Sequence, residues 1–151
     1  MDYLEGKAVL KVVNGLVVEK SAISKAGAST KALFNVVGGR VIMKNIILEI
    51  TTVFGAGANN TNLVHTPTGG AEVALCAVLD TADDAEGLMY SISGLAATGL
   101  LEGLGAVTSQ TYDMTLKAGV IGLKTAGNTT GAVKATLVYV PLDPGAYVEA
   151  A

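Results

Sequence analysis

Four carboxylates lie close together between Asp80 and Gly87: Asp80, Asp83, Asp84 and Glu86. Hard cations such as Ca²⁺ bind six or more oxygen atoms, and clustered carboxylates in a loop that ends in glycine can supply several of them. Their spacing does not match an EF-hand loop. We therefore interpret this segment as a solvated acidic turn, with a weak calcium site as the alternative, and expect no resident metal ion.

Nucleophilic catalysis would need Cys76 or a serine beside the single histidine, His65. Cys76 lies between Leu75 and Ala77 in an apolar stretch, where cysteine usually behaves as a small hydrophobic residue. His65 is expected as a partly exposed residue on a strand. Neither phosphate-binding glycine motif, Gly-x-Gly-x-x-Gly or Walker A, is present. The sequence thus predicts no catalytic residue, no cofactor and no enzymatic activity.

The composition favours a single domain that is partly covered by other subunits. Of the 151 residues, half are hydrophobic and 15% are charged, whereas roughly a quarter is typical of soluble domains. The net charge of −3, without a Lys/Arg cluster, argues against nucleic acid as a partner. No apolar run approaches the roughly 20 residues that span a bilayer, and the acidic N-terminus lacks the pattern of a signal peptide.

The stretch around Gly38-Gly39 is the clearest strand signal. Two glycines between β-branched runs predict a two-residue hairpin turn, followed by one long strand over residues 40–53. Period-two alternation there places Ile42, Ile46, Leu48 and Ile50 on the core face. The opposite face is mixed and is expected to contact a neighbouring subunit; it comprises Met43, Asn45, Ile47, Glu49 and Thr51.

Residues 1–30 are expected to form an N-terminal arm. Residues 11–18 fit a hairpin with an Asn14-Gly15 turn, and the alternative is a helix that Gly15 ends. Residues 21–30 are small and polar, which indicates a linker. The arm should meet a neighbouring subunit through Val12, Val13, Leu16 and Val17. Deleting residues 1–25 should then weaken assembly and leave the main domain folded.

The main domain is expected over residues 31–151. About eight strands at close spacing, joined by Gly-rich turns, predict an all-β fold. Their unequal lengths favour a jelly-roll-like β-sandwich over a regular barrel. One of these predicted strands, over residues 71–79, alternates in a way that indicates a largely buried strand.

Two stretches resemble structural proteins of tailed-bacteriophage virions. One is Phe34 to Thr52, with its Val-Val-Gly-Gly-Arg-Val sequence, continued by Ala58-Asn59-Asn60-Thr61. The other is Thr130 to Ala146, with Val-Tyr-Val-Pro-Leu-Asp. The resemblance is to small proteins that decorate or cement the capsid or form head fibres, and it covers about residues 31–148.

The resemblance implies a non-enzymatic capsid decoration protein. Such a protein would be made in the host cytoplasm and would assemble on the head as a symmetric homo-oligomer, with a trimer favoured. Its partners would be further copies of itself and the major capsid protein, with no membrane or nucleic acid. The alternatives are a receptor- or glycan-binding fibre or adhesin sandwich, and a component of the tail or head–tail joint. Scarce aromatic residues and the absence of tryptophan weigh against glycan binding.

Overall fold

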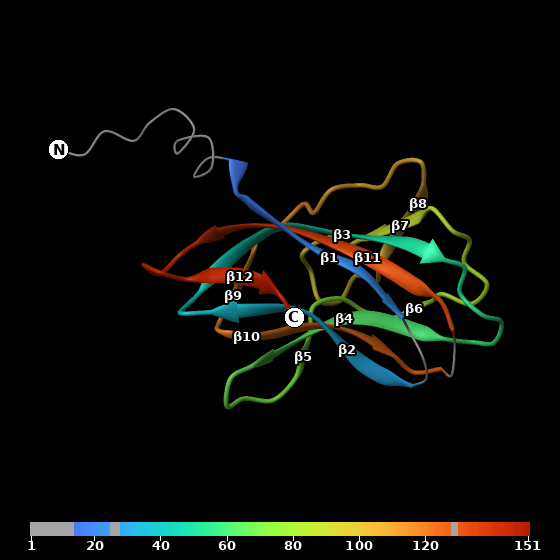
Figure 1. Ribbon diagram of the computed structural model, residues 1–151, viewed down its shortest axis with the longest axis horizontal. Coiled ribbons are helices and arrows are strands. Elements are labelled where there is room, and N and C mark those ends of the chain that lie inside the picture. Colours follow the sequence, from blue (N-terminus) through green and yellow to red (C-terminus); the bar gives the residue numbers. More distant parts are fainter. Residues whose placement is uncertain (1–13, 25–27, 128–129) are drawn as a thin grey trace.

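The computed structural model describes residues 14–24, 28–127 and 130–151. All the numbered elements within these ranges are β-strands (Figure 1). They are β1 (Leu16–Ser24), β2 (Ser29–Val37), β3 (Val41–Thr52), β4 (Asn60–Pro67), β5 (Val73–Ala74), β6 (Leu79–Asp80), β7 (Leu88–Ser91), β8 (Leu101–Leu104), β9 (Met114–Leu116), β10 (Gly119–Thr125), β11 (Ala132–Pro141) and β12 (Tyr147–Ala150).

The strands form two antiparallel sheets. Sheet A has the order β1-β11-β3-β7-β8, with β9 pairing β3 beyond the end of β7. Sheet B has the order β12-β2-β10-β4-β5, with β6 also pairing β4. The predicted all-β sandwich is therefore confirmed.

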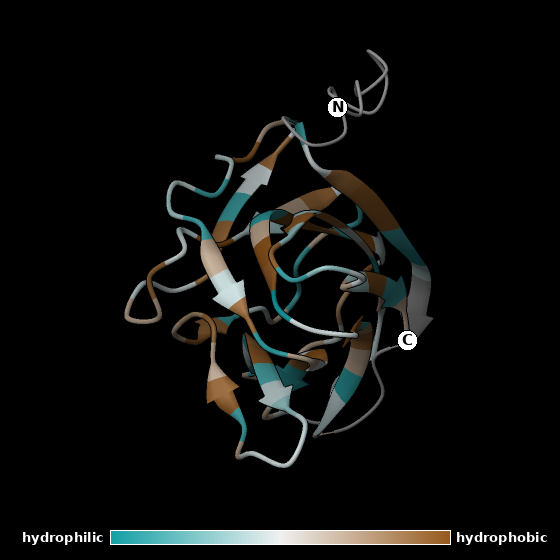
Figure 2. Cartoon of the chain, turned by 90° about the vertical axis from the view of Figure 1, so that its left-hand side faces the viewer, coloured by the Kyte–Doolittle hydropathy of each residue, from teal (hydrophilic) through white to brown (hydrophobic). Residues whose placement is uncertain are grey.

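Alternating side chains explain why these segments form strands with one buried face. In β11, buried Val133, Ala135, Leu137 and Tyr139 alternate with half-buried residues. Figure 2 shows hydrophobic and hydrophilic residues in close succession along the strands. The buried side chains of both sheets form one hydrophobic cluster, in which Tyr90, Phe34 and Phe54 are the largest fully buried side chains.

The hairpin predicted at Gly38-Gly39 is wrong. Both glycines have positive φ, +79° and +146°, as expected. However, β2 belongs to sheet B and β3 to sheet A, so the turn crosses from one sheet to the other. A crossing turn and a hairpin turn can both require positive φ at two residues, and therefore the sequence signal is the same for both.

A β-bulge in β3 changes which residues face the core. Asn45 pairs with Val138 while Met43 pairs with Tyr139, so Lys44 is an extra residue with no partner in β11. The bulge shifts the alternation by one position. As a result Met43 is fully buried and Ile42 is half-buried, which reverses the predicted faces of these two residues.

The N-terminal prediction needs correction over its described part. Asn14 is helical and Gly15 has a φ of +89°, so these two residues do not form the predicted hairpin turn; the segment before Asn14 lies outside the described residues. The linker expected over 21–30 is also wrong, because β1 continues to Ser24 and β2 begins at Ser29. Since β1 pairs with β11, a deletion of residues 1–25 would remove a strand of the sandwich. Val12 and Val13 lie outside the described residues.

The long buried strand predicted over residues 71–79 is also wrong. Only Val73–Ala74 and Leu79–Asp80 are paired strands, and residues 71–74 are exposed. Between them the chain runs beside the middle of β4, where the Leu75 N–H donates to the Leu63 carbonyl (2.9 Å). The edge of sheet B is therefore short and interrupted here.

Candidate functional site

The acidic loop does not assemble a metal site. Asp80 accepts hydrogen bonds from the backbone N–H groups of Asn59 (2.8 Å) and Ala82 (3.2 Å). Asp84 instead accepts a hydrogen bond from the Tyr90 hydroxyl. In the part of the chain that the structure describes, no group of three or more His, Cys, Asp or Glu side chains could hold a metal ion. Asp80, Asp83, Asp84 and Glu86, the loop considered for a weak calcium site, thus do not make up such a group.

The loop is anchored by a buried polar network. The Asn59 amide donates to the hydroxyls of Thr61 and Thr81 (both 3.1 Å), and its side-chain oxygen accepts from the N–H of Gly127 (2.8 Å). Asn59 and Thr81 are fully buried, and the threonine hydroxyls lie 2.8 Å apart. Because buried polar groups are costly unless they are paired, this network fixes the loop rather than leaving groups free for chemistry.

Cys76 is fully buried, and its sulfur accepts a hydrogen bond from the Leu63 N–H (3.3 Å). Burial raises the pKa of the thiol, and the hydrogen bond from Leu63 only partly opposes this effect. The thiolate is the nucleophilic form of cysteine. Cys76 therefore has the environment of a core residue.

Four of the predicted interface residues lie on one surface. Cross-strand partners in an antiparallel pair point to the same side of the sheet. The pairs Val17–Val138, Val138–Asn45, Thr136–Ile47 and Lys134–Glu49 therefore place Val17, Asn45, Ile47 and Glu49 on the outer face of sheet A. We call this surface the sheet A outer face; its residues are Val17, Glu19, Asn45, Ile47, Glu49, Lys134, Thr136 and Val138.

Met43 and Leu16, the other predicted interface residues that the structure describes, do not share this surface. Met43 is fully buried, and Leu16 packs against the core. A loop of the chain itself also covers one end of the outer face, because the Gln110 N–H donates to Asn45 Oδ1 (3.1 Å) and Lys44 pairs with Asp113 (2.7 Å). The part that remains open is centred on Val17, Thr136 and Ile47.

The two stretches that carry the virion resemblance contact each other. Arg40 donates to both carboxylate oxygens of Asp143, from Nε (2.9 Å) and Nη2 (2.7 Å), and its backbone N–H donates as well (2.8 Å). These hydrogen bonds lower the pKa of Asp143 to about 2. The Arg40–Asp143 pair therefore joins the β2–β3 turn to the β11–β12 turn.

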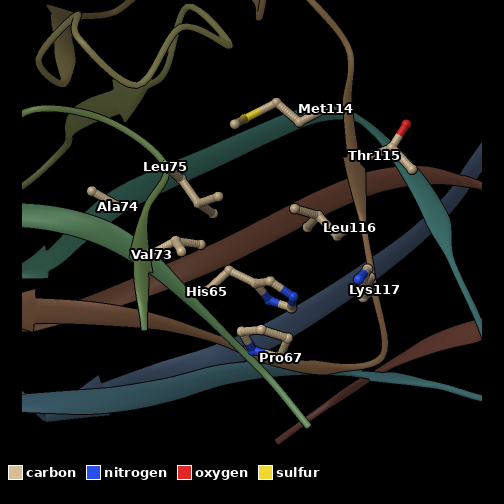
Figure 3. A pocket seen from close by; sticks show the side chains of 9 residues that line it. All are labelled: His65, Pro67, Val73, Ala74, Leu75, Met114, Thr115, Leu116 and Lys117. Carbon is tan, nitrogen blue, oxygen red and sulfur yellow. The ribbon is translucent and has the colours of Figure 1, made fainter. Parts of the chain in front are cut away.

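A pocket of about 360 Å³ opens where the edges of both sheets are short (Figure 3). His65 and Pro67 of β4 and Val73 of β5 line one side, and Met114 and Leu116 of β9 line the other. Leu75 and Lys117 also line the pocket. Most of the lining is apolar, because the pocket continues the core between the two sheets.

His65 points into this pocket rather than to solvent. It pairs with Ile121 on one side and Val73 on the other, so the three side chains share the inner face of sheet B. The imidazole is only 3% exposed, which corrects the expected partly exposed position. The five residues from Thr61 to His65 are all buried and do not alternate between polar and apolar types, so no local pattern indicated this inward orientation. No sequence pattern predicted that Lys117 would line the same pocket as His65.

Comparisons with protein-family models, curated proteins and solved structures find no match for this chain. Among the described residues, no helix is long and apolar enough to cross a membrane.

Proposed function

We propose that this chain is a non-enzymatic structural protein of a tailed-bacteriophage virion, a capsid decoration or cement protein that assembles as a trimer on the head. The observation that carries the proposal is the sheet A outer face. Val17 is 68% exposed there, beside half-buried Thr136 and Ile47. A flat, mixed surface of this kind suits contact with other subunits.

Three of the eight residues on this face are charged, and they are partly paired. Lys134 lies 3.5 Å from Glu19 and opposite Glu49 in the β11–β3 register. Exposed ion pairs of this type contribute little to stability, but they reduce unpaired charge on a surface that must be covered. The face thus combines exposed apolar area with little net charge, as expected for an interface between copies.

The strand order supports the jelly-roll form of the sandwich. The first four strands pair antiparallel with later strands in reverse order: β1 with β11, β2 with β10, β3 with β7 and β4 with β5. A ribbon rolled in this way, with strands alternating between two sheets, is a jelly roll. Jelly rolls occur in viral capsid and lectin domains, so the fold is compatible with the proposal, although it does not select a function.

The proposal is tested by light scattering and by co-sedimentation with heads of the phage that encodes the chain, prepared from virus lacking the gene. The expected result is a particle of three times 15.2 kDa that binds heads saturably. Thr136→Arg, at the centre of the sheet A outer face, should reduce trimer mass or head binding. Thr66→Arg is the matched control, because Thr66 is a half-buried threonine facing outward from sheet B.

Either of two results would overturn the proposal. Heads that bind no protein would exclude decoration of the capsid, and equal effects of the two arginine variants would exclude the sheet A outer face. Binding on a glycan array would instead favour the receptor-binding alternative, for which exposed Tyr112 and Tyr147 offer the aromatic surfaces.

A further inference from the structure

His65 is a buried polar group that the fold leaves unsatisfied. Among the described residues, neither ring nitrogen reaches a hydrogen-bond partner in bonding geometry. Backbone groups of Val120 and Lys117 approach the ring and favour its protonated form, but burial has the larger effect and lowers the pKa of His65. The imidazole is therefore neutral at pH 7, with one N–H donor and one acceptor nitrogen.

An unpaired polar group in this position needs a partner from outside the fold. Leaving a buried donor or acceptor unsatisfied costs roughly 1–3 kcal/mol, and native proteins contain few such groups. Figure 3 shows the His65 ring inside the pocket, with Leu116 and Lys117 on the side toward which the ring extends. A bound molecule can supply the missing hydrogen bonds there.

The neutral imidazole indicates which chemical group the bound molecule places at the buried end of the pocket. A hydroxyl can donate to the bare nitrogen of a neutral imidazole or accept from its N–H, so it matches whichever ring nitrogen faces the pocket. A charged group at this depth would lose its hydration without an opposite charge to compensate for it.

The walls and the rim of the pocket indicate the chemistry of the rest of the bound molecule. Val73, Leu75, Met114 and Leu116 offer apolar contacts, which suit a flat ring or a short hydrocarbon body. Lys117 is exposed at the pocket, and no acidic side chain in the described part of the chain forms an ion pair with it. Its ammonium group is therefore available to a carboxylate at the outer end.

We propose that this pocket binds a small aromatic hydroxycarboxylate. Its ring lies between the apolar walls, its hydroxyl hydrogen-bonds to the imidazole of His65, and its carboxylate pairs with Lys117. This inference concerns the edge of the sandwich and not the sheet A outer face, so it does not depend on the proposed virion function.

The single histidine makes a direct test possible, because its imidazole resonances need no assignment among several. The full-length protein, labelled with ¹⁵N and ¹³C, is titrated with 4-hydroxyphenylacetate while the His65 side-chain signals are recorded. The expected result is a saturable shift. Phenylacetate, which lacks the hydroxyl, and tyrosol, which lacks the carboxylate, should each bind roughly three- to tenfold more weakly, the loss typical of one hydrogen bond or ion pair.

Two lysine variants separate the roles. Lys117→Met should weaken binding of 4-hydroxyphenylacetate to about the level of tyrosol and leave tyrosol binding unchanged, whereas Lys31→Met, which is outside the pocket, should change neither. The proposal is overturned if the His65 signals do not move at millimolar ligand. It is also overturned if the three compounds bind equally, since that would indicate apolar contact without the two polar roles.

Discussion

Replacing Met43 by alanine distinguishes a core residue from an interface residue. The unbroken alternation of the sequence puts Met43 on the same face as Ile47, whereas the bulge at Lys44 turns Met43 into the core. Met43 is fully buried opposite Tyr139, and Ile47 is half-buried on the sheet A outer face. The two alanine variants should therefore behave differently.

The expected loss of stability in each alanine variant follows from how deeply the truncated side chain is buried. Truncating a fully buried methionine to alanine costs about 2–5 kcal/mol, because the transfer free energy of the side chain and the cavity both count. At about 3 kcal/mol and a shift of roughly 2–4 °C per kcal/mol for a domain of this size, Met43→Ala should lower the Tm by roughly 6–12 °C. Ile47→Ala removes a side chain that is only half buried, so it should cost about 1 kcal/mol.

The assay is urea unfolding of each variant at two protein concentrations. A core defect lowers the unfolding midpoint equally at both concentrations, whereas an interface defect depends on concentration because assembly stabilises by mass action. Met43→Leu is the control, since a swap that conserves volume should cost less than about 1.5 kcal/mol. If Met43→Ala and Ile47→Ala lowered the midpoint equally, or if Met43→Ala changed only the oligomer mass, the assignment of the bulge would be wrong.

Four further outcomes follow from the structure. Because the pKa of His65 is lowered in the fold, the unfolded chain binds protons more readily, and stability should fall as pH drops below about 6.5; urea midpoints at pH 7.5 and 5.5 should show a smaller drop in His65→Leu. The stabilisation from Asp143, whose pKa is about 2, is present above pH 3.8 and lost toward pH 2, so acid titration should bring the midpoints of wild type and Asp143→Asn together. Asn59→Ala removes hydrogen bonds to two buried threonines and to Gly127, and should lower the unfolding free energy in urea by roughly 2–4 kcal/mol. Deleting residues 1–25 removes β1 from β11, and calorimetry should find a much lower Tm or no transition; an unchanged Tm would show that β1 is dispensable.

The sequence predicted strands and turns well because both depend on local chemistry. Period-two alternation identified β3 and β11, and the paired glycines at 38–39 identified a turn with positive φ. The sheet to which each strand belongs was not predictable, because β2 and β3 carry the same local pattern whether they pair with each other or cross between sheets.

Two features of the candidate surface and pocket could not be predicted, because no pattern in the neighbouring sequence marks them. The bulge at Lys44 is set by the register of β11 against β3, more than 80 residues away in the chain, so the facing of Met43 could not be derived from alternation. The pocket arises because β5 and β9 are short in two different sheets, which brings Lys117 near His65. By contrast, Asn45, Ile47 and Glu49 could be predicted together, because period two holds from Asn45 onward.

The Arg40–Asp143 contact shows that the two stretches that resemble virion proteins meet at one corner of the fold. Gly38 and Gly39 lie so close to the second stretch that a Cβ atom on either would meet the Gly145 carbonyl (2.9 Å) or Asp143 Cβ (2.8 Å). One turn takes the chain from sheet B to sheet A, and the other returns it from β11 to β12 in sheet B. The glycines, Arg40 and Asp143 are thus jointly required to close one end of the sandwich. Proteins that share them would share this corner of the fold. The resemblance also extends over most of the sheet A outer face, because Asn45, Ile47 and Glu49 lie in the first stretch and Lys134, Thr136 and Val138 lie in the second, whereas His65 lies outside both.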